Sequence, residues 1–425
     1  MYRIRFVNDL GNGHSGYIEY QNLYVQTISG QSITTQPNGP AGSDAFGRLR
    51  TSNPVTIFDS QHRYQENDKW STASGNSGST TYQVNKSAVD LNVTTASGDY
   101  IYRETKRVFP YQPGKSLLIN NSFVFATAQT NLRQRVGYFG VDNGIYFEQE
   151  DTTLYMVLRS KVSGSVVNTR IAQGDWNGDK LNGLGLSGLI LNPTKGNIFW
   201  TDVEWLGVGD VRCGFIINGQ LIICHTFKNT NEKDSTYMTT AALPLRQEIE
   251  NTDTIASGTS AQQICASVVS EGGYTAAGQT YSIDRGATPI TLSTAGTTYP
   301  VISIRLNSSR LDAVIILSEI YGVITSNDRC KWTLLKNTTL TGASYTTHSN
   351  GNVDYDTSAT SLSGGTVING SYINLQGENQ VGGPADFTYQ LGRTIAGVSD
   401  VLTLAVTPIS NNTNVLFGLK WIEAL

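Results

Sequence analysis

Apolar and polar residues alternate with a period of two along most of the chain. Tyr2–Val7 and Gly16–Ile28 show the alternation near the start, and short runs of the same kind recur from Val55 onward. Their spacing is close to the roughly 8–12 residues that separate successive strands in β-sandwiches. The pattern therefore predicts an all-β fold, in which a helical turn is expected only near Leu243–Ile249.

Two short sequences predict tight hairpin turns. Asp142-Asn143-Gly144 and Asn218-Gly219 favour them, because both central residues of a type I′ turn need a positive φ. Cys213 and Cys224 are equally far from the second turn, so they can lie opposite each other on its two strands. These positions would allow a cross-strand disulfide, but two buried free thiols are the favoured interpretation.

Composition divides the chain into three parts. Residues 29–55 are polar and rich in Gly, Ser, Thr and Pro, and a second shift toward Thr, Ser, Ala and Gly occurs near residues 251–300. We predict that residues 1–55 form N-terminal strands and an extended docking arm. Residues 56–290 are expected to form a first β-sandwich and residues 291–425 a second, both of jelly-roll or lectin-like type. No repeat of fixed period is present, which excludes propellers and solenoids.

The predicted arm contains one group of bulky side chains. Phe46, Arg48, Leu49 and Arg50 are the only large apolar and cationic residues within residues 39–52. We expect them to dock the arm, with Phe46 filling a pocket and the arginines pairing with carboxylates or backbone carbonyls. The alternative is that Phe46 packs against the first sandwich of its own chain.

The C-terminal segment predicts a strand with one fully buried face. Val415, Phe417, Leu419 and Trp421 alternate with a mixed set of residues in this segment. Such an apolar strand would aggregate if it were unpaired. It is therefore expected inside the second sandwich or at an oligomer interface.

Charge and composition exclude several classes of protein. Lys and Arg total 30 against 34 acidic residues, a net charge of −4, which argues against a protein that coats nucleic acid. No apolar run approaches the ~18 residues of a membrane span, and the first residues lack the apolar region of a secretory signal. The four histidines and four cysteines lack metal-ligand spacing, so we predict no metal and no cofactor.

Carboxylates provide the candidates for catalysis. Asp202 and Glu204 alternate on one strand face, and Glu148 supplies a further acidic group. A glycoside hydrolase needs two carboxylates that flank one bond, one of them with a raised pKa. Solvent-facing strand carboxylates explain these residues more simply, and the E-x-D-x-x-E strand motif of many sandwich-fold glycosidases is missing. We predict that the protein is not an enzyme; a polysaccharide depolymerase that uses these carboxylates is the alternative.

Tryptophans provide the candidates for sugar binding. Trp176 and Trp205 form a possible stacking platform at the edge of the first sandwich. Trp200 and Trp205 are separated by an odd number of positions, so on a regular strand they point to opposite faces. At least one of these two is therefore expected in the core.

Several runs of sequence resemble a known group of proteins. The segment DAFGRLRTSNPVTIFDSQHRY (44–64) resembles the N-terminal signature of structural proteins from tailed bacteriophages, especially marine and cyanobacterial phages. Further runs that add to the resemblance are EWLGVGDVRCGFIINGQLIICHTF (204–227), LPLRQEIEN (243–251), QQICASVVSEGGY (262–274) and NTTLTGASYTTHSNGNVDYDTSAT (337–360). The resemblance implies a virion component that is assembled in the host cytoplasm. It carries no catalytic residues and leaves capsid, neck, baseplate and fibre open as locations.

These observations together predict a virion structural protein that acts by assembly. It is expected to be a capsid- or tail-associated decoration, adaptor or fibre component that binds other virion proteins. A homo-oligomer is expected, with a trimer as the guess, because fibre and decoration proteins often form trimers. The alternative is a receptor-binding tail protein whose first sandwich recognises host surface polysaccharide as a lectin does. Neither interpretation involves nucleic acid or insertion into a membrane.

Overall fold

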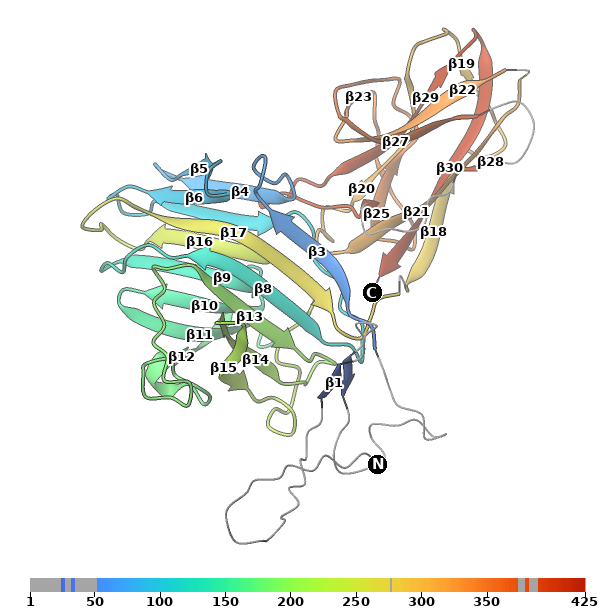
Figure 1. Ribbon diagram of the computed structural model, residues 1–425. Coiled ribbons are helices and arrows are strands. Elements are labelled where there is room, and N and C mark those ends of the chain that lie inside the picture. Colours follow the sequence, from blue (N-terminus) through green and yellow to red (C-terminus); the bar gives the residue numbers. More distant parts are fainter. Residues whose placement is uncertain are drawn as a thin grey trace, which may run out of the picture.

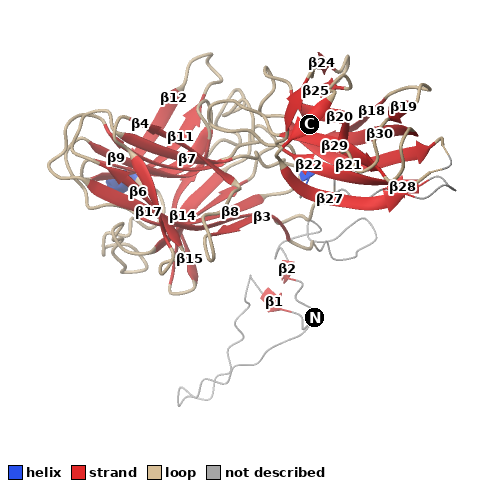
Figure 2. Cartoon of the chain, turned by 90° about the horizontal axis from the view of Figure 1, so that it is seen from above, coloured by secondary structure: helices blue, strands red, loops and turns tan. Residues whose placement is uncertain are grey.

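Two β-sandwiches lie side by side in the structure (Figure 1, Figure 2). The computed structural model describes the backbone of residues 24–26, 32–34 and 379–381, and backbone and side chains of residues 52–275, 277–326, 328–373 and 389–424. Apart from the short 3-10 turn η2 (Gln173–Asp175) and a brief turn at Tyr389, the regular elements of these residues are strands. The all-β prediction is confirmed. The short strands β1 (Tyr24–Gln26) and β2 (Ser32–Thr34) pair with each other.

The first sandwich consists of two antiparallel sheets. The seven-stranded sheet has the order β12-β11-β10-β9-β16-β7-β4, and the eight-stranded sheet has the order β15-β14-β13-β8-β17-β6-β5 with β3 also paired to β17. The first sheet comprises β4 (Trp70–Gly75), β7 (Tyr100–Thr105), β9 (Leu132–Phe139), β10 (Gly144–Glu150), β11 (Thr153–Ser160), β12 (Val167–Ala172) and β16 (Leu245–Asn251). The second comprises β3 (Val55–Gln61), β5 (Ser79–Gln83), β6 (Ala88–Val93), β8 (Leu117–Val124), β13 (Asn197–Val203), β14 (Val211–Ile217), β15 (Gln220–Phe227) and β17 (Thr259–Ser270).

Aromatic side chains from both sheets fill the space between them. Phe147 on the seven-stranded sheet packs edge to face on Phe215 of the eight-stranded sheet, with ring centroids 5.1 Å apart. Phe123 and Phe199 complete the group at 6.0 Å from Phe147. All four rings are fully buried. Every second residue of these strands points inward, which is the reason that the period-two pattern is visible in the sequence.

The second sandwich begins earlier in the chain than predicted. Gln279–Asp284, which the predicted boundary at residue 290 places in the first sandwich, forms β18 and pairs with the C-terminal strand. The composition of this segment matches both neighbouring regions, so it does not assign the segment to either sandwich. Only the long-range pairing with the C-terminal strand does. The strands of the second sandwich are β18, β19 (Ile290–Leu292), β20 (Tyr299–Leu306), β21 (Val314–Ile324), β22 (Cys330–Lys336), β24 (Thr346–Thr347), β25 (Val353–Asp356), β27 (Thr366–Ile373), β28 (Asn379–Val381), β29 (Val401–Pro408) and β30 (Thr413–Ala424), and β23 (Thr339–Thr341) with β26 (Ser361–Ser363) forms a small separate sheet.

The last strand lies inside the second sandwich. β30 pairs with β21 on one side and with β18 and β19 on the other. Val415, Phe417, Leu419 and Trp421 are all buried, as predicted. The structure thus favours the intramolecular alternative for this strand.

Two local predictions have different outcomes. Asn218 and Gly219 have φ values of 53° and 76°, which confirms the tight turn between β14 and β15. The helical turn near Leu243–Ile249 is wrong, because β16 occupies this segment and alternates between the core and the outer face of the sheet. Cys213 and Cys224 are free and buried, and a bulge shifts the register so that Cys213 lies opposite His225.

A small interface joins the two sandwiches. Gln390 Nε2 donates to the carbonyl oxygen of Val108 at 2.9 Å, and Val108 packs with Val314 and Ile316 of the second sandwich. The Arg393 N–H donates to the carbonyl oxygen of Lys106 at 2.6 Å. Over the described residues, no helix has the length and apolar character that a membrane crossing requires.

Candidate functional site

A chain of alternating charges crosses the outer face of the seven-stranded sheet. The inward residues of these strands fill the core, so the residues between them face away from it. Six of the outward residues, together with Arg393 of the second sandwich, form an unbroken series in which arginines and glutamates alternate. From the edge strand to the second sandwich they are Arg170, Glu148, Arg135, Glu248, Arg246, Glu104 and Arg393.

Arg135 is the centre of this ion-pair chain. Its Nε donates to Glu148 Oε2 at 2.6 Å and its Nη1 donates to Glu248 Oε2 at 3.0 Å. Arg246 continues the chain, with 2.5 Å from its Nε to Glu248 Oε1 and 2.6 Å from its Nη1 to Glu104 Oε2. All five of these side chains are buried. Desolvation alone would raise the pKa of Glu248, but Arg246 and Arg135 hold it below the ordinary value.

The ends of the chain reach the sheet edge and the second sandwich. Arg170 Nη2 lies 2.7 Å from Glu148 Oε1. At the other end, Arg393 Nη1 donates to Glu104 Oε1 at 2.8 Å and thereby links the sandwiches. The prediction that Glu148 faces solvent is wrong, since Glu148 is buried and pairs with Arg135 and Arg170. The arrangement is suited to holding strands together, because every carboxylate in it is already paired.

A cavity of about 500 Å³ lies where β13 ends and β8 and β14 begin. Asp202 and Glu204 both line it, as their spacing in the sequence indicated. Asp202 is only 6% exposed, so the expectation that it faces solvent is wrong, whereas Glu204 is exposed. The other lining residues are Tyr111, Gly114, Lys115, Ser116, Leu206, Asp210, Arg212 and Thr226.

Cross-strand partners fix the carboxylate of Asp202. Asp202 lies opposite Arg212 in the register of β13 and β14, and Arg212 Nη2 donates to Asp202 Oδ2. Asp202 Oδ1 is buried and, within the described part of the chain, accepts no hydrogen bond. A buried carboxylate oxygen without a partner is costly, so this atom marks a place where a donor from a ligand would be stabilising.

Hydrogen bonds also set the charge of the cavity rim. Burial alone would raise the pKa of Asp210, but backbone N–H groups of Asn229 and Thr230, at 2.7 and 3.0 Å from its Oδ1, hold it below the ordinary value. Burial raises the pKa of Tyr111, which therefore stays a neutral phenol at neutral pH. Lys115 Nζ donates to Gln112 Oε1 at 2.7 Å.

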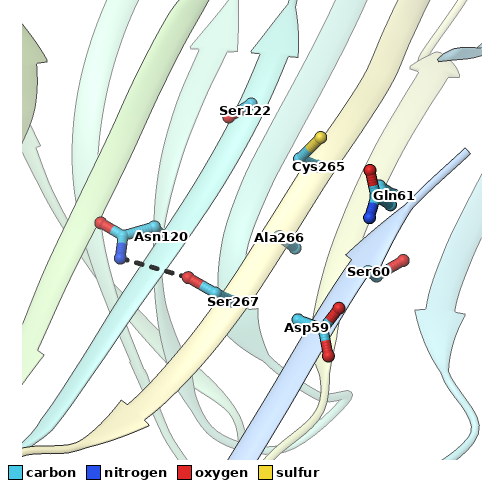
Figure 3. A pocket seen from close by; sticks show the side chains of 8 residues that line it. All are labelled: Asp59, Ser60, Gln61, Asn120, Ser122, Cys265, Ala266 and Ser267. Atoms are coloured by element: carbon cyan, nitrogen blue, oxygen red, sulfur yellow. Dashed lines mark hydrogen bonds between the residues drawn. The ribbon is translucent and has the colours of Figure 1, made fainter. Parts of the chain in front are cut away.

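A second, smaller hollow of about 240 Å³ lies on the outer face of the eight-stranded sheet (Figure 3). Figure 3 shows side chains of β3, β17 and β8 around it, among them Asp59, Cys265 and Asn120. Asn120 Nδ2 donates to Ser267 Oγ at 3.3 Å. Burial raises the pKa of Cys265, so the thiol is protonated at neutral pH and is a weak nucleophile. Among the described residues, no group of three or more His, Cys, Asp or Glu side chains could hold a metal ion.

The two tryptophans predicted as a sugar platform have different environments. Trp176 is 2% exposed and packs in the core, where its Nε1 donates to the carbonyl oxygen of Ile171 at 3.1 Å. It presents no ring face to solvent and is a core residue instead of part of a platform. Trp205 is partly buried against the core and lies edge to face with Tyr237, with centroids 5.0 Å apart.

The predicted docking group lies outside the described residues. Phe46, Arg48, Leu49 and Arg50 all belong to residues 35–51, so their role in docking stays a prediction. Sequence analysis in turn missed Arg212, Asp210, Lys115 and Tyr111 as cavity residues. The turn at Asn218-Gly219 pairs Arg212 with Thr226, but only the pairing of β13 with β14 brings Arg212 opposite Asp202. Tyr111 and Lys115 are too far away in sequence for any local pattern to indicate them.

Comparisons with known proteins give similarities of fold only. No family model matches the sequence, and no curated protein matches it. Three similar solved structures are the Emp47p carbohydrate recognition domain (9% identity, 54% of this chain and 99% of that chain, TM-score 0.34), a Bacillus licheniformis β-glucanase (13%, 50% and 96%, 0.32) and the CBM2 module of the evolved Dit of Lactobacillus casei BL23 phage J-1 (6%, 53% and 99%, 0.35). Similarities this distant say nothing about function.

Proposed function

We propose that the protein is a structural component of a bacteriophage virion and acts by assembly instead of catalysis. The resemblance of residues 44–64 to phage structural proteins motivates the proposal. The structural observation that carries it is an apolar loop, residues 182–190, on the first sandwich. Its partners would be other virion proteins and further copies of the chain, for which a trimer is our expectation.

The apolar loop presents large aliphatic side chains to solvent. Leu184 is 90% exposed, Ile190 is 73% exposed, and Leu186 is completely exposed. Burying one such side chain is worth about 1.5–3 kcal/mol, so three of them represent a substantial driving force for association. Several large apolar side chains exposed within one short loop favour an interaction site more than single exposed residues scattered over a surface do.

The loop is held in a defined conformation. Asp179 Oδ1 accepts from the Leu181 N–H at 2.9 Å, and its Oδ2 accepts from the Ser187 N–H at 2.7 Å. A bridge between Asn182 and Ile190 closes the base of the loop. A preorganised loop loses little conformational entropy when it docks, which favours a role as a contact surface.

The segment before the loop covers the edge of the eight-stranded sheet. The Asp179 N–H donates to the carbonyl oxygen of Ile223 on the edge strand β15 at 2.9 Å. Ile223 and Leu221 on this strand are themselves exposed. Their side chains therefore add exposed apolar surface next to the loop, which favours this region as a contact surface.

The buried carboxylates support a role without catalysis. A glycosidase needs a general acid with a raised pKa. Arginines surround Glu148, Glu248 and Glu104, and the pKa of Glu248 is held below its ordinary value. Glu248 therefore stays ionised at neutral pH and is unsuited to donate a proton.

Mass spectrometry of purified virions from a phage that carries this gene tests the proposal. We expect the protein in the particle, after its assembly in the host cytoplasm, and a Leu184→Ser, Leu186→Ser double variant is expected to fold but to be depleted from particles. Val141→Ser, Val398→Ser is the matched control, because both valines are exposed single residues outside the loop. Absence of the wild-type protein from particles would refute the proposal, and normal incorporation of the loop variant would refute the role of the loop.

A further inference from the structure

We propose that the cavity at Asp202 binds a neutral saccharide, with Asp202 and Arg212 as its main hydrogen-bonding groups. This inference goes beyond the proposed role in assembly and does not depend on it. It rests on the geometry of the cavity, on its balance of charge, and on the backbone conformation of Leu206 at its rim.

The first argument concerns the hydrogen bonds of the two carboxylate oxygens of Asp202. Arg212 occupies Oδ2, while Oδ1 is buried and lacks a hydrogen-bond partner within the described residues. The carboxylate is held by strand β13 and by its pairing across to β14, so it cannot turn to satisfy Oδ1 without losing Arg212. It is therefore a preorganised acceptor for a donor that enters the cavity.

The second argument is that donors and acceptors alternate around the cavity. The Arg212 side chain is about half exposed and has N–H groups beyond the one that Asp202 uses. Thr226 lies directly opposite Arg212 in the register of β14 and β15 and adds a hydroxyl group. Every sugar hydroxyl both donates and accepts. Two neighbouring hydroxyls can therefore donate to Asp202 Oδ1 and accept from Arg212 at the same time.

The third argument is charge. The carboxylates of Asp202, Glu204 and Asp210 face the cations of Lys115 and Arg212, so the lining is close to neutral. A phosphate or polyanionic ligand would need an excess of cations, and none is present among these residues. A neutral, hydroxyl-rich ligand fits the balance best.

The fourth argument concerns Leu206. Its φ of 44° lies in the left-handed region, which is unfavourable for a leucine, and its side chain is exposed. The turn that holds it there is closed by the N–H groups of Val208 and Gly209, which donate to the carbonyl oxygen of Trp205 at 3.0 and 2.7 Å. Leu206 thus presents an aliphatic surface at the rim, suited to the C–H face of a pyranose ring. The cavity volume of about 500 Å³ is within the range of small-molecule sites, about 300–1,000 Å³.

Calorimetric titration of the full-length protein tests the inference. The probes are glucose, galactose, mannose, N-acetylglucosamine and their common disaccharides, with sialic acid and inorganic phosphate as charged comparisons. We expect at least one neutral sugar to bind, and Asp202→Asn to weaken that binding about tenfold because a charge-assisted hydrogen bond is lost. Thr226→Trp, which fills the cavity, is expected to abolish binding. Asp59→Asn, in the hollow of Figure 3, is the matched control and should leave binding unchanged.

Each outcome decides the question. Thermal unfolding of every variant shows whether it is folded, and Asp202→Asn alone suffices if the bulky variant does not fold. Absence of binding by all neutral sugars, or wild-type affinity in both Asp202→Asn and Thr226→Trp, would overturn the inference. Tighter binding of sialic acid or phosphate than of any neutral sugar would overturn the ligand class. None of these results bears on the presence of the protein in virions, so the two proposals can fail separately.

Discussion

Removal of Arg135 from the ion-pair chain should destabilise the first sandwich strongly. Arg135→Met keeps much of the side-chain volume but leaves Glu148 and Glu248 without their shared cation. Breaking a buried ion pair in this way typically costs about 3–5 kcal/mol, because the remaining charge is buried without compensation. Glu148 keeps Arg170 and Glu248 keeps Arg246, so we expect a loss near the lower end, about 3 kcal/mol.

The size of the loss in unfolding free energy distinguishes a buried ion-pair network from an ordinary surface ion pair. Lys161→Met is the matched control in the same sandwich, since Lys161 Nζ lies 2.9 Å from Asp142 Oδ2 and both side chains are about 40% exposed. Exposed pairs contribute about 0–1 kcal/mol. The free energy of unfolding is measured by urea titration, with the transitions of the two sandwiches fitted separately, because two units need not unfold together.

Two further measurements test whether the unpaired charges of Glu148 and Glu248 cause the destabilisation. Replacing Glu148 and Glu248 by glutamine in the Arg135→Met background removes the unpaired charges and should recover part of the stability. In Arg135→Met alone, loss of a cation should raise the pKa of Glu248, so the penalty should shrink as the pH falls toward 5. A destabilisation by Arg135→Met no larger than that by Lys161→Met would refute the reasoning.

Two other predictions concern stability. Trp421→Ala should destabilise the second sandwich by about 3–5 kcal/mol in urea unfolding, because this fully buried ring packs beside Tyr281 and His348; a change below about 1 kcal/mol would contradict the assigned packing. Burial, helped by the Arg103 cation, lowers the pKa of His62 to about 4, so the folded state holds a neutral imidazole. The stability from this group is fully present above the unfolded pKa of about 6.5 and is lost as the pH falls from there through about 4, by about 3 kcal/mol in total. The difference in unfolding free energy between wild type and His62→Gln should therefore change by this amount over the window, and a constant difference would show that His62 does not titrate there.

The sequence alone determined the features that depend on short-range physics. Strand periodicity is visible because every second side chain enters a core, as in β30, where Phe417 and Trp421 are buried as expected. The turn at Asn218-Gly219 was predictable because few other residues accept two successive positive φ values. The number of sandwiches followed from composition, but the boundary did not, since only pairing with β30 assigns β18 to the second one.

Tertiary structure alone decided the candidate sites. Alternation placed Asp202 and Glu204 near each other, but burial of Asp202 requires β8 and β14 on either side of it. The ion-pair chain could not be predicted, because Glu148, Arg135 and Glu248 meet only after β16 inserts between β9 and β7, more than a hundred residues from either. The helical expectation for the segment of β16 failed for the same reason. The neighbours of a strand in the sheet determine which of its side chains are buried and which partners they meet. The order of strands in a sheet is set by long-range packing that local sequence does not encode.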